Sequence, residues 1–182
     1  MTALPLHPFV VHFPMALMAI IPVLILFVAI ALWRKWLPGR AWFLVVAFQA
    51  ALLASSVVAL NTGEQDEELV EKVVAEAALE SHEDAAKSFT FGAAIVLLLG
   101  LTPLAFRKRE SLQRIAAGTT LLGSLALLGM GVNVGHKGGE LVYAHGAAQA
   151  HSTQRKAVLS EPEAKSETGE HEEDEKEADD DD

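Results

Sequence analysis

Four long apolar segments are the feature that most limits what this chain can fold into. They cover about residues 9–33, 41–60, 85–106 and 115–134 of the 182-residue sequence. Each is close to the roughly 20 residues that an α-helix needs to cross the hydrocarbon core of a bilayer. Lys87 is the only Asp, Glu, Lys or Arg within them. The sequence therefore predicts an all-α membrane protein, a four-transmembrane-helix bundle whose first partner is the lipid bilayer.

The two short basic connections between the spans predict the orientation. Residues 34–40 contain three basic side chains, and residues 107–114 contain four, opposed only by Glu110. Short loops rich in Lys and Arg stay on the cytoplasmic side of a membrane. We therefore expect a bacterial inner (cytoplasmic) membrane protein, with both termini and the connection between the second and third spans outside.

The connection between the second and third spans has a regular pattern of apolar and acidic residues. Between residues 63 and 87, apolar residues such as Val70, Val73 and Val74 recur near helical spacing, and acidic residues fill the positions between them. This spacing is typical of an amphipathic helix. We expect an extramembrane amphipathic helix that lies against the outer mouth of the bundle.

The C-terminal segment has a different composition. Residues 161–182 hold 13 acidic and 2 basic residues, whereas the whole chain has a net charge of −10. The acidity therefore belongs to the tail, which has too little apolar surface to offset the entropy of ordering it. The sequence predicts a four-helix transmembrane domain over residues 1–151 and a disordered acidic tail over residues 152–182.

Five of the seven histidines fall at the predicted outer ends of the spans: His7, His12, His82, His136 and His145. Imidazole is the commonest protein ligand for metals and a usual ligand of haem iron, so this gathering predicts a cofactor site. Glycines on both sides of His136 predict that the fourth helix ends there and that the chain folds back to present His145.

The histidines are not equivalent as candidate ligands. His7 and His12 are five residues apart, and their side chains would diverge by roughly 140° on a regular helix. For His12 a ligand role and a structural role are equally favoured, whereas for His7 a structural or supporting role is favoured. His12 and His82 are the predicted ligand pair, and His136 and His145 form a second pair or contact the edge of the cofactor.

The chain resembles a known family at several of these positions. The motifs are Leu6-His7-Pro8, Val11-His12-Phe13-Pro14, Thr62-Gly63 with Asp66, His82, Gly135-His136, and the stretch from Gly138 to Gly146 that contains His145. Together they resemble the small four-span bacterial membrane proteins catalogued as domain of unknown function 2231, over about residues 6–146. The resemblance implies the four-helix topology and an outer cluster of His and Asp, and it implies no activity.

Composition and motifs exclude several chemistries. The chain has no cysteine, which excludes iron–sulfur clusters, covalently attached haem, blue copper and thiolate zinc sites within it. No phosphate-binding loop, His-Glu-x-x-His helix or Gly-x-Ser-x-Gly elbow occurs, and nothing supports nucleic-acid binding. The absence of Asp and Glu from the spans argues against a cation-coupled transporter.

Three hypotheses remain. The first is a b-type haem protein that transfers electrons to or from a redox partner protein or a quinone. The second is a Zn or Cu binding or sensing protein, in which His12, His82, His136 and His145 join acidic residues such as Asp66. The third is a structural membrane protein whose histidines satisfy helix ends.

Overall fold

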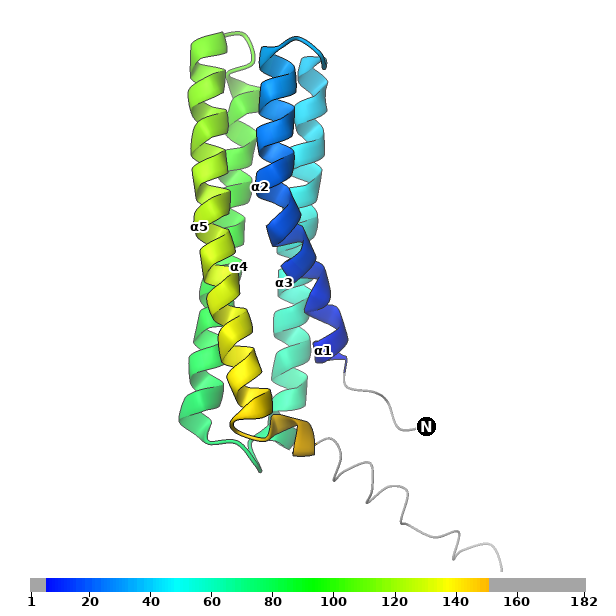
Figure 1. Cartoon of the computed structure of the whole chain (residues 1–182), viewed down its shortest axis with the longest axis vertical. Helices are drawn as coiled ribbons and strands as arrows, with labels where there is room; N and C mark the ends of the chain where they lie inside the picture. The colour runs from blue at the N-terminus through cyan, green and yellow to red at the C-terminus, as the bar shows by residue number, and fades with distance from the viewer. Residues whose placement is uncertain (1–5, 151–182) are drawn as a thin grey trace, which may run out of the picture.

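The chain forms a bundle of four long helices in the computed structural model, which describes residues 6–150 (Figure 1). The elements are α1 (His7–Val10), α2 (His12–Trp33), the short 3₁₀ helix η1 (Gly39–Ala41), α3 (Trp42–Val70), α4 (Glu76–Ala105) and α5 (Glu110–Tyr143). No strand occurs among the described residues. Four stretches are long and apolar enough to cross a membrane. The first is α1 together with α2, the second is η1 together with most of α3, and α4 and α5 are the third and the fourth. The predicted all-α, four-span architecture is confirmed.

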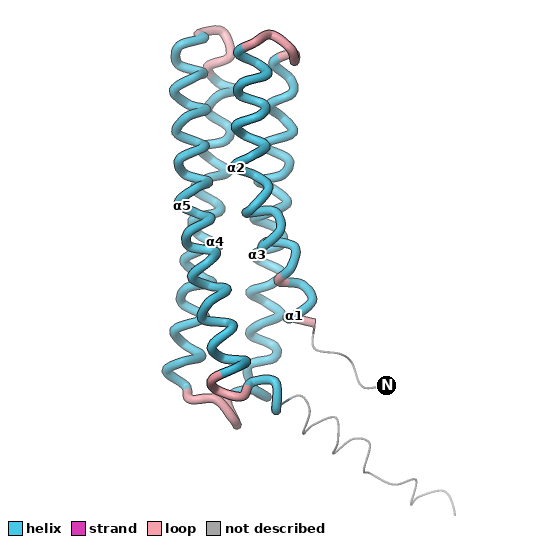
Figure 2. The backbone as a smooth tube through the Cα atoms, viewed as in Figure 1, coloured by secondary structure: helices cyan, strands magenta, loops and turns pink. Residues whose placement is uncertain are grey.

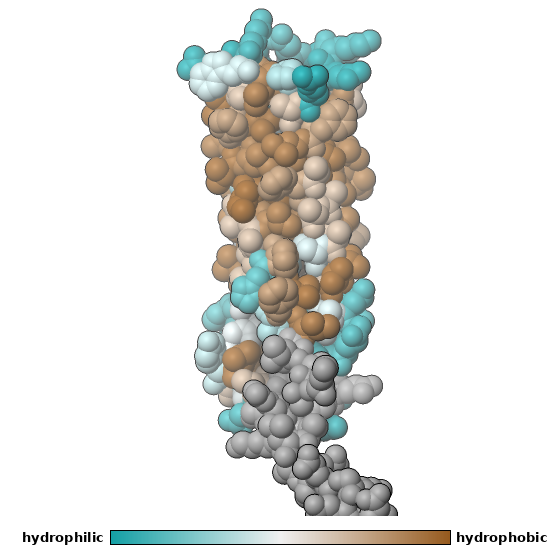
Figure 3. Space-filling view, turned by 90° about the vertical axis from the view of Figure 1, so that its right-hand side faces the viewer, coloured by the Kyte–Doolittle hydropathy of each residue, from teal (hydrophilic) through white to brown (hydrophobic). Residues whose placement is uncertain are grey.

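The surface of the bundle has the apolar belt expected of a protein in lipid. Outward-facing side chains such as Val23 (68% exposed), Phe27 (58%) and Leu122 (68%) are as apolar as those inside. Figure 3 shows this belt along the length of the bundle, with hydrophilic residues concentrated toward the two ends. A water-soluble protein rarely leaves so large an apolar surface uncovered. The lipid bilayer is therefore the environment of these helices.

The bundle core lies toward the end that carries the basic loops, and all four spans contribute to it. Its buried members are Met18, Ile21, Ile25, Val28, Trp42, Val45, Leu52, Phe89, Ala93, Val96, Ala117 and Leu127. Loops connect the helices at both ends, and one further break separates α1 from α2 (Figure 2).

Proline explains the break between α1 and α2. Pro14 has no backbone N–H and cannot bond to the carbonyl of Val10, four residues earlier. Helical bonding resumes where the N–H of Met15 donates to the Val11 carbonyl, at 3.3 Å. The regular helix is therefore interrupted at Val11, and α1, which carries His7, packs on α3.

A second proline, Pro103, disturbs α4 inside the core. It removes the backbone donor that would bond to the carbonyl of Leu99. The hydroxyl of Thr120 from α5 donates to this carbonyl at 3.0 Å, and the hydroxyl of Thr102 does so at 2.6 Å. The indole N–H of Trp42 donates to the next carbonyl, that of Gly100, at 2.8 Å. Side chains from α3 and α5 thus satisfy the backbone of α4 where lipid cannot.

Gly100 also allows α3 to approach α4 closely. The side-chain amide of Gln49, which is 1% exposed, fills the space that a β-carbon at position 100 would need. Neither amide atom of Gln49 has a hydrogen-bond partner among the described residues. A larger residue at position 100 would therefore displace the buried side chain of Gln49.

This close contact predicts that Gly100→Ala lowers stability. The added methyl group would collide with the Gln49 amide, and overpacking of this kind costs about 1–3 kcal/mol. The control is Gly118→Ala in α5, whose added β-carbon meets nothing within 4 Å. Because Ala favours a helix over Gly, the control should be neutral or more stable by up to about 1 kcal/mol. Thermal unfolding in detergent measures both, and equal midpoints would contradict the packing described here.

Two local expectations from the sequence are wrong. Residues 63–87 do not form a helix of their own, because α3 continues to Val70 and α4 begins at Glu76 after a short turn. The apolar positions instead form a small cluster of Val70, Val74, Leu141 and Ala147 at the end of the bundle. The amphipathic spacing came from the ends of two long helices that pack there.

The fourth helix also does not end near His136. Helix α5 continues through the glycines to Tyr143, and the chain turns at Gly146, whose φ is +76°. The glycines serve helix packing, since a β-carbon on Gly135 would lie 3.3 Å from Met15 and one on Gly138 would lie 3.1 Å from His82. The predicted tail, residues 152–182, lies outside the described residues and stays a prediction.

Candidate cofactor site

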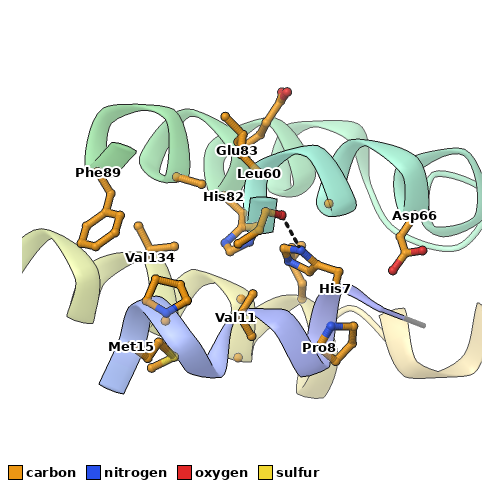
Figure 4. A pocket seen from close by; sticks show the side chains of 18 of the residues that line it. His7, Pro8, Val11, Met15, Leu60, Asp66, His82, Glu83, Phe89 and Val134 are labelled. Atoms are coloured by element: carbon orange, nitrogen blue, oxygen red, sulfur yellow. Dashed lines mark hydrogen bonds between the residues drawn. The ribbon is translucent and has the colours of Figure 1, made fainter. Parts of the chain in front are cut away.

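The half of the bundle that contains α1 encloses a cavity. A cavity of about 750 Å³, here called the central cavity, is lined by residues from α1, α2, α3, α4 and α5. Its walls extend from His7 to Met18, eleven residues or about 16 Å along a helix axis. Met18 packs against Gly131 and Phe89 where the cavity meets the solid core. The lining is mainly apolar, with imidazole and carboxylate groups among the side chains nearer the end of α1 (Figure 4).

His7 lies at the start of α1, and its ring is fixed by α3. Its Nδ1 lies 2.9 Å from the carbonyl oxygen of Ala59 and 3.4 Å from the hydroxyl of Thr62. A carbonyl only accepts, so Nδ1 carries the proton and donates it. In the neutral ring, Nε2 therefore holds the lone pair. Gly63 leaves room for this ring, because a β-carbon there would lie 3.1 Å from its Cε1.

His82 lies in α4 and is packed against α5. Its Nδ1 is buried and has no hydrogen-bond partner among the described residues, and its ring contacts the backbone carbonyl of Val134. A β-carbon on Gly138 would lie 3.1 Å from its Cε1. The ammonium group of Lys137 bonds to the carbonyl and the hydroxyl of Ser81, at 2.9 and 2.7 Å, and so joins the two helices beside the histidine.

The two imidazoles form a pair across the central cavity. Their ring centres are 6.5 Å apart and their planes are nearly perpendicular, at 83°. Figure 4 shows His7 and His82 next to each other, with Val11, Met15 and Val134 in the surrounding wall. The His7 ring is held through Nδ1 by the Ala59 carbonyl, and the His82 ring lies against Val134 with a buried Nδ1 that has no partner among the described residues. A ligating histidine usually donates from its second nitrogen to a carbonyl or carboxylate, as His7 does.

The other predicted site residues are distributed differently. His12 and Asp66 line the central cavity, although His12 is exposed and its Nδ1 lies 3.3 Å from the carbonyl of Phe9. His136 is 72% exposed and faces Glu140, with 3.4 Å between Nε2 and the carboxylate. His145 is exposed as well, and neither His136 nor His145 is among the residues that line the cavity. Three of the five histidines thus share one cavity.

A multidentate metal site does not form among these groups. Within residues 6–150, no three or more His, Cys, Asp or Glu side chains lie close enough together to hold one metal ion. The central cavity offers instead a pair of imidazoles, His7 and His82. Two axial nitrogens can complete a cofactor that brings its own equatorial ligands, whereas a structural zinc site takes four protein ligands.

The sequence favoured a structural or supporting role for His7, and that role stays a prediction. The divergence of roughly 140° between His7 and His12 applied to a regular helix, whereas the structure interrupts the helix at Val11 and places His7 beside α3. Its position depends on the Ala59 carbonyl, which no sequence motif reports. The neighbouring Thr62-Gly63 was a usable signal, because a small residue leaves room for a ring.

Comparison with known proteins places the chain in a family. The model of the family described as predicted membrane protein (DUF2231) matches residues 3–151. The chain belongs to this family. No curated protein and no solved structure matches the chain. Family membership agrees with the four membrane-spanning helices and assigns no activity to the central cavity.

The glycine beside His82 yields a testable prediction. Gly138→Ala would force the imidazole to move by a few tenths of an ångström, whereas a β-carbon on the adjacent Gly139 meets nothing within 4 Å. We expect the NMR signal of the His82 Cε1–H group, in detergent-solubilised protein with labelled histidine, to shift in Gly138→Ala and to stay in place in Gly139→Ala. Equal shifts in both variants would contradict the packing of His82 against α5.

Proposed function

We propose that this membrane protein binds a b-type haem in the central cavity, with His7 and His82 as the axial ligands. The observation that carries the proposal is the pair of imidazoles, 6.5 Å apart at the wall of an apolar cavity. The Ala59 carbonyl holds His7 through Nδ1 and leaves its Nε2 available, and the Nδ1 of His82 has no partner among the described residues. This pair replaces the pair of His12 and His82 expected from the sequence.

The spacing of the rings fits two ligands of one metal. Metal–imidazole bonds of about 2.0–2.1 Å would allow the ring centres of two imidazoles on one metal to lie about 6 Å apart. The angle of 83° between the planes is compatible, because rotation about each metal–nitrogen bond leaves the nitrogen in place. The cavity of about 750 Å³ is within the roughly 300–1,000 Å³ typical of cofactor sites.

A haem held in this way would serve electron transfer, because two protein ligands leave no open position for a substrate. When bound, such a group supplies one-electron redox chemistry. The Ala59 carbonyl fixes the proton of His7 on Nδ1, and Val134 orients His82. Val11, Met15 and Phe89 contribute apolar side chains to the wall around the pair. The electron partner would be a membrane quinone or a redox protein.

The pair predicts the result of histidine substitutions. His7→Ala and His82→Ala should each abolish or strongly alter haem binding, because one imidazole then provides half of the axial coordination. The matched control is His136→Ala, since His136 is 72% exposed and lies outside the cavity lining. Absorption spectra of detergent-purified protein, expressed with ample haem, measure the Soret band and the reduced α and β bands.

Several outcomes would contradict this proposal. A colourless wild type with stoichiometric zinc or copper would support metal binding, in which Asp66 or His12 joins the pair. A wild type that binds neither would support a structural membrane protein. Normal haem content in both His7→Ala and His82→Ala would move the site elsewhere.

We further propose that the protein lies in the inner membrane of a bacterium, with the central cavity on the outer side. The support is the seven basic side chains in the connections 34–40 and 107–114, at the end of the bundle away from α1. Single cysteines can test this, because the chain has none. In cells whose outer membrane has been permeabilised, a maleimide that cannot cross the inner membrane should label Glu80→Cys readily. It should label Lys108→Cys only after the cells are lysed. The reverse labelling pattern would overturn the orientation.

A further inference from the structure

The end of the bundle away from the central cavity carries a concentrated positive charge. We call it the basic rim, defined as Arg34, Lys35, Arg40, Arg107, Lys108, Arg109 and Arg114. Two tryptophans accompany it, Trp33 (65% exposed) and Trp36 (67% exposed). Tryptophan side chains collect where a bilayer meets water, at the depth of the lipid headgroups. The basic rim therefore lies at headgroup level.

Two of the arginines are held against these rings. The guanidinium carbon of Arg114, from α5, lies 5.3 Å from the ring centre of Trp33, at the end of α2. The guanidinium carbon of Arg34 lies 5.8 Å from the ring centre of Trp36. A guanidinium beside an aromatic ring keeps its planar fork of N–H donors, which can bind phosphate oxygens two at a time.

One of these donors already has an anionic partner. Nη2 of Arg114 lies 3.2 Å from the carboxylate of Glu110, one helical turn earlier. Both side chains are largely exposed, at 55% and 75%, so the ion pair is weak and a phosphate group can compete with it. Glu110 is also the only acidic residue in the two connections.

We propose that the basic rim binds the headgroup of an anionic phospholipid, with Arg34 and Arg114 as the principal contacts. The charge of the rim complements a lipid phosphate, and the tryptophans place both arginines at its depth. The opposite end of the bundle carries acidic side chains such as Glu64, Asp66 and Glu83, which repel such a headgroup. Anionic lipid is therefore recognised on one side of the membrane. This site is independent of the proposed haem.

Tryptophan fluorescence in vesicles tests this site directly. Full-length protein is reconstituted in phosphatidylcholine that contains a fixed fraction of either brominated phosphatidylglycerol or brominated phosphatidylcholine. Bromine quenches the exposed Trp33 and Trp36, whereas Trp42, 1% exposed, provides a steady background. We expect several-fold stronger binding of the anionic lipid. Equal quenching by the two lipids would overturn the proposal and leave an acidic protein as the partner suited to the rim.

Substitutions distinguish a defined site from diffuse attraction. Arg34→Gln and Arg114→Gln should each weaken the preference for anionic lipid by more than about fivefold, which is the effect of any one basic side chain near a charged membrane surface. Arg40→Gln removes the same charge without a described tryptophan contact and should have a smaller effect. Glu110→Gln should strengthen binding. Equal losses in all three arginine variants would reject the site, as would full displacement of the lipid by inorganic phosphate. Unchanged thermal midpoints confirm that the variants are folded.

Discussion

The hydrocarbon core of a bilayer has no hydrogen-bonding groups, and this constraint explains most of the bundle. Each backbone carbonyl released by a proline inside the membrane must find a protein partner. In α4 the hydroxyls of Thr102 and Thr120 meet the Leu99 carbonyl, and the indole of Trp42 meets the neighbouring carbonyl of Gly100, so side chains of α3 and α5 are fixed beside the proline. The core toward the basic rim is therefore held by polar contacts as well as by apolar packing.

The packing of the helices differs between the two halves of the bundle. Toward the basic rim, small residues bring the helices together, as where Gly100 meets Gln49. Beyond Met18 the helices enclose the central cavity instead. There the glycines at positions 63 and 138 accommodate imidazoles rather than a neighbouring helix. Glycine thus allows close helix packing in one half of the bundle and makes room for imidazole rings in the other.

The sequence was sufficient for the architecture because hydrophobic length is a strong signal. Four uncharged runs of about 20 residues allow few alternatives to four membrane-spanning helices. Local boundaries were harder to predict. The glycines around His136 have the composition of a helix end, but in α5 they face Met15 and His82 in other helices. A sequence records that a residue is small, and only the packed structure records what occupies the space beside it.

The candidate site, like the fold, was predictable from the sequence only in part. The histidines and Asp66 were identifiable from residue type and from their position at the span ends, and the structure brings His7, His12, His82 and Asp66 to one cavity. The pairing of His7 with His82 was not predictable, because it depends on the break at Val11 and on a backbone carbonyl at Ala59.

Helix α1 is held mainly by α3. It packs on α3 and adjoins α2, and its His7 ring meets the His82 ring of α4. A movement of these four residues would change the distance between the two imidazoles while the core remained intact. Exchange of any molecule in the central cavity would then be controlled by a local opening, whose free energy is far smaller than that of unfolding the bundle. A very stable protein can in this way retain a site that loads and empties easily.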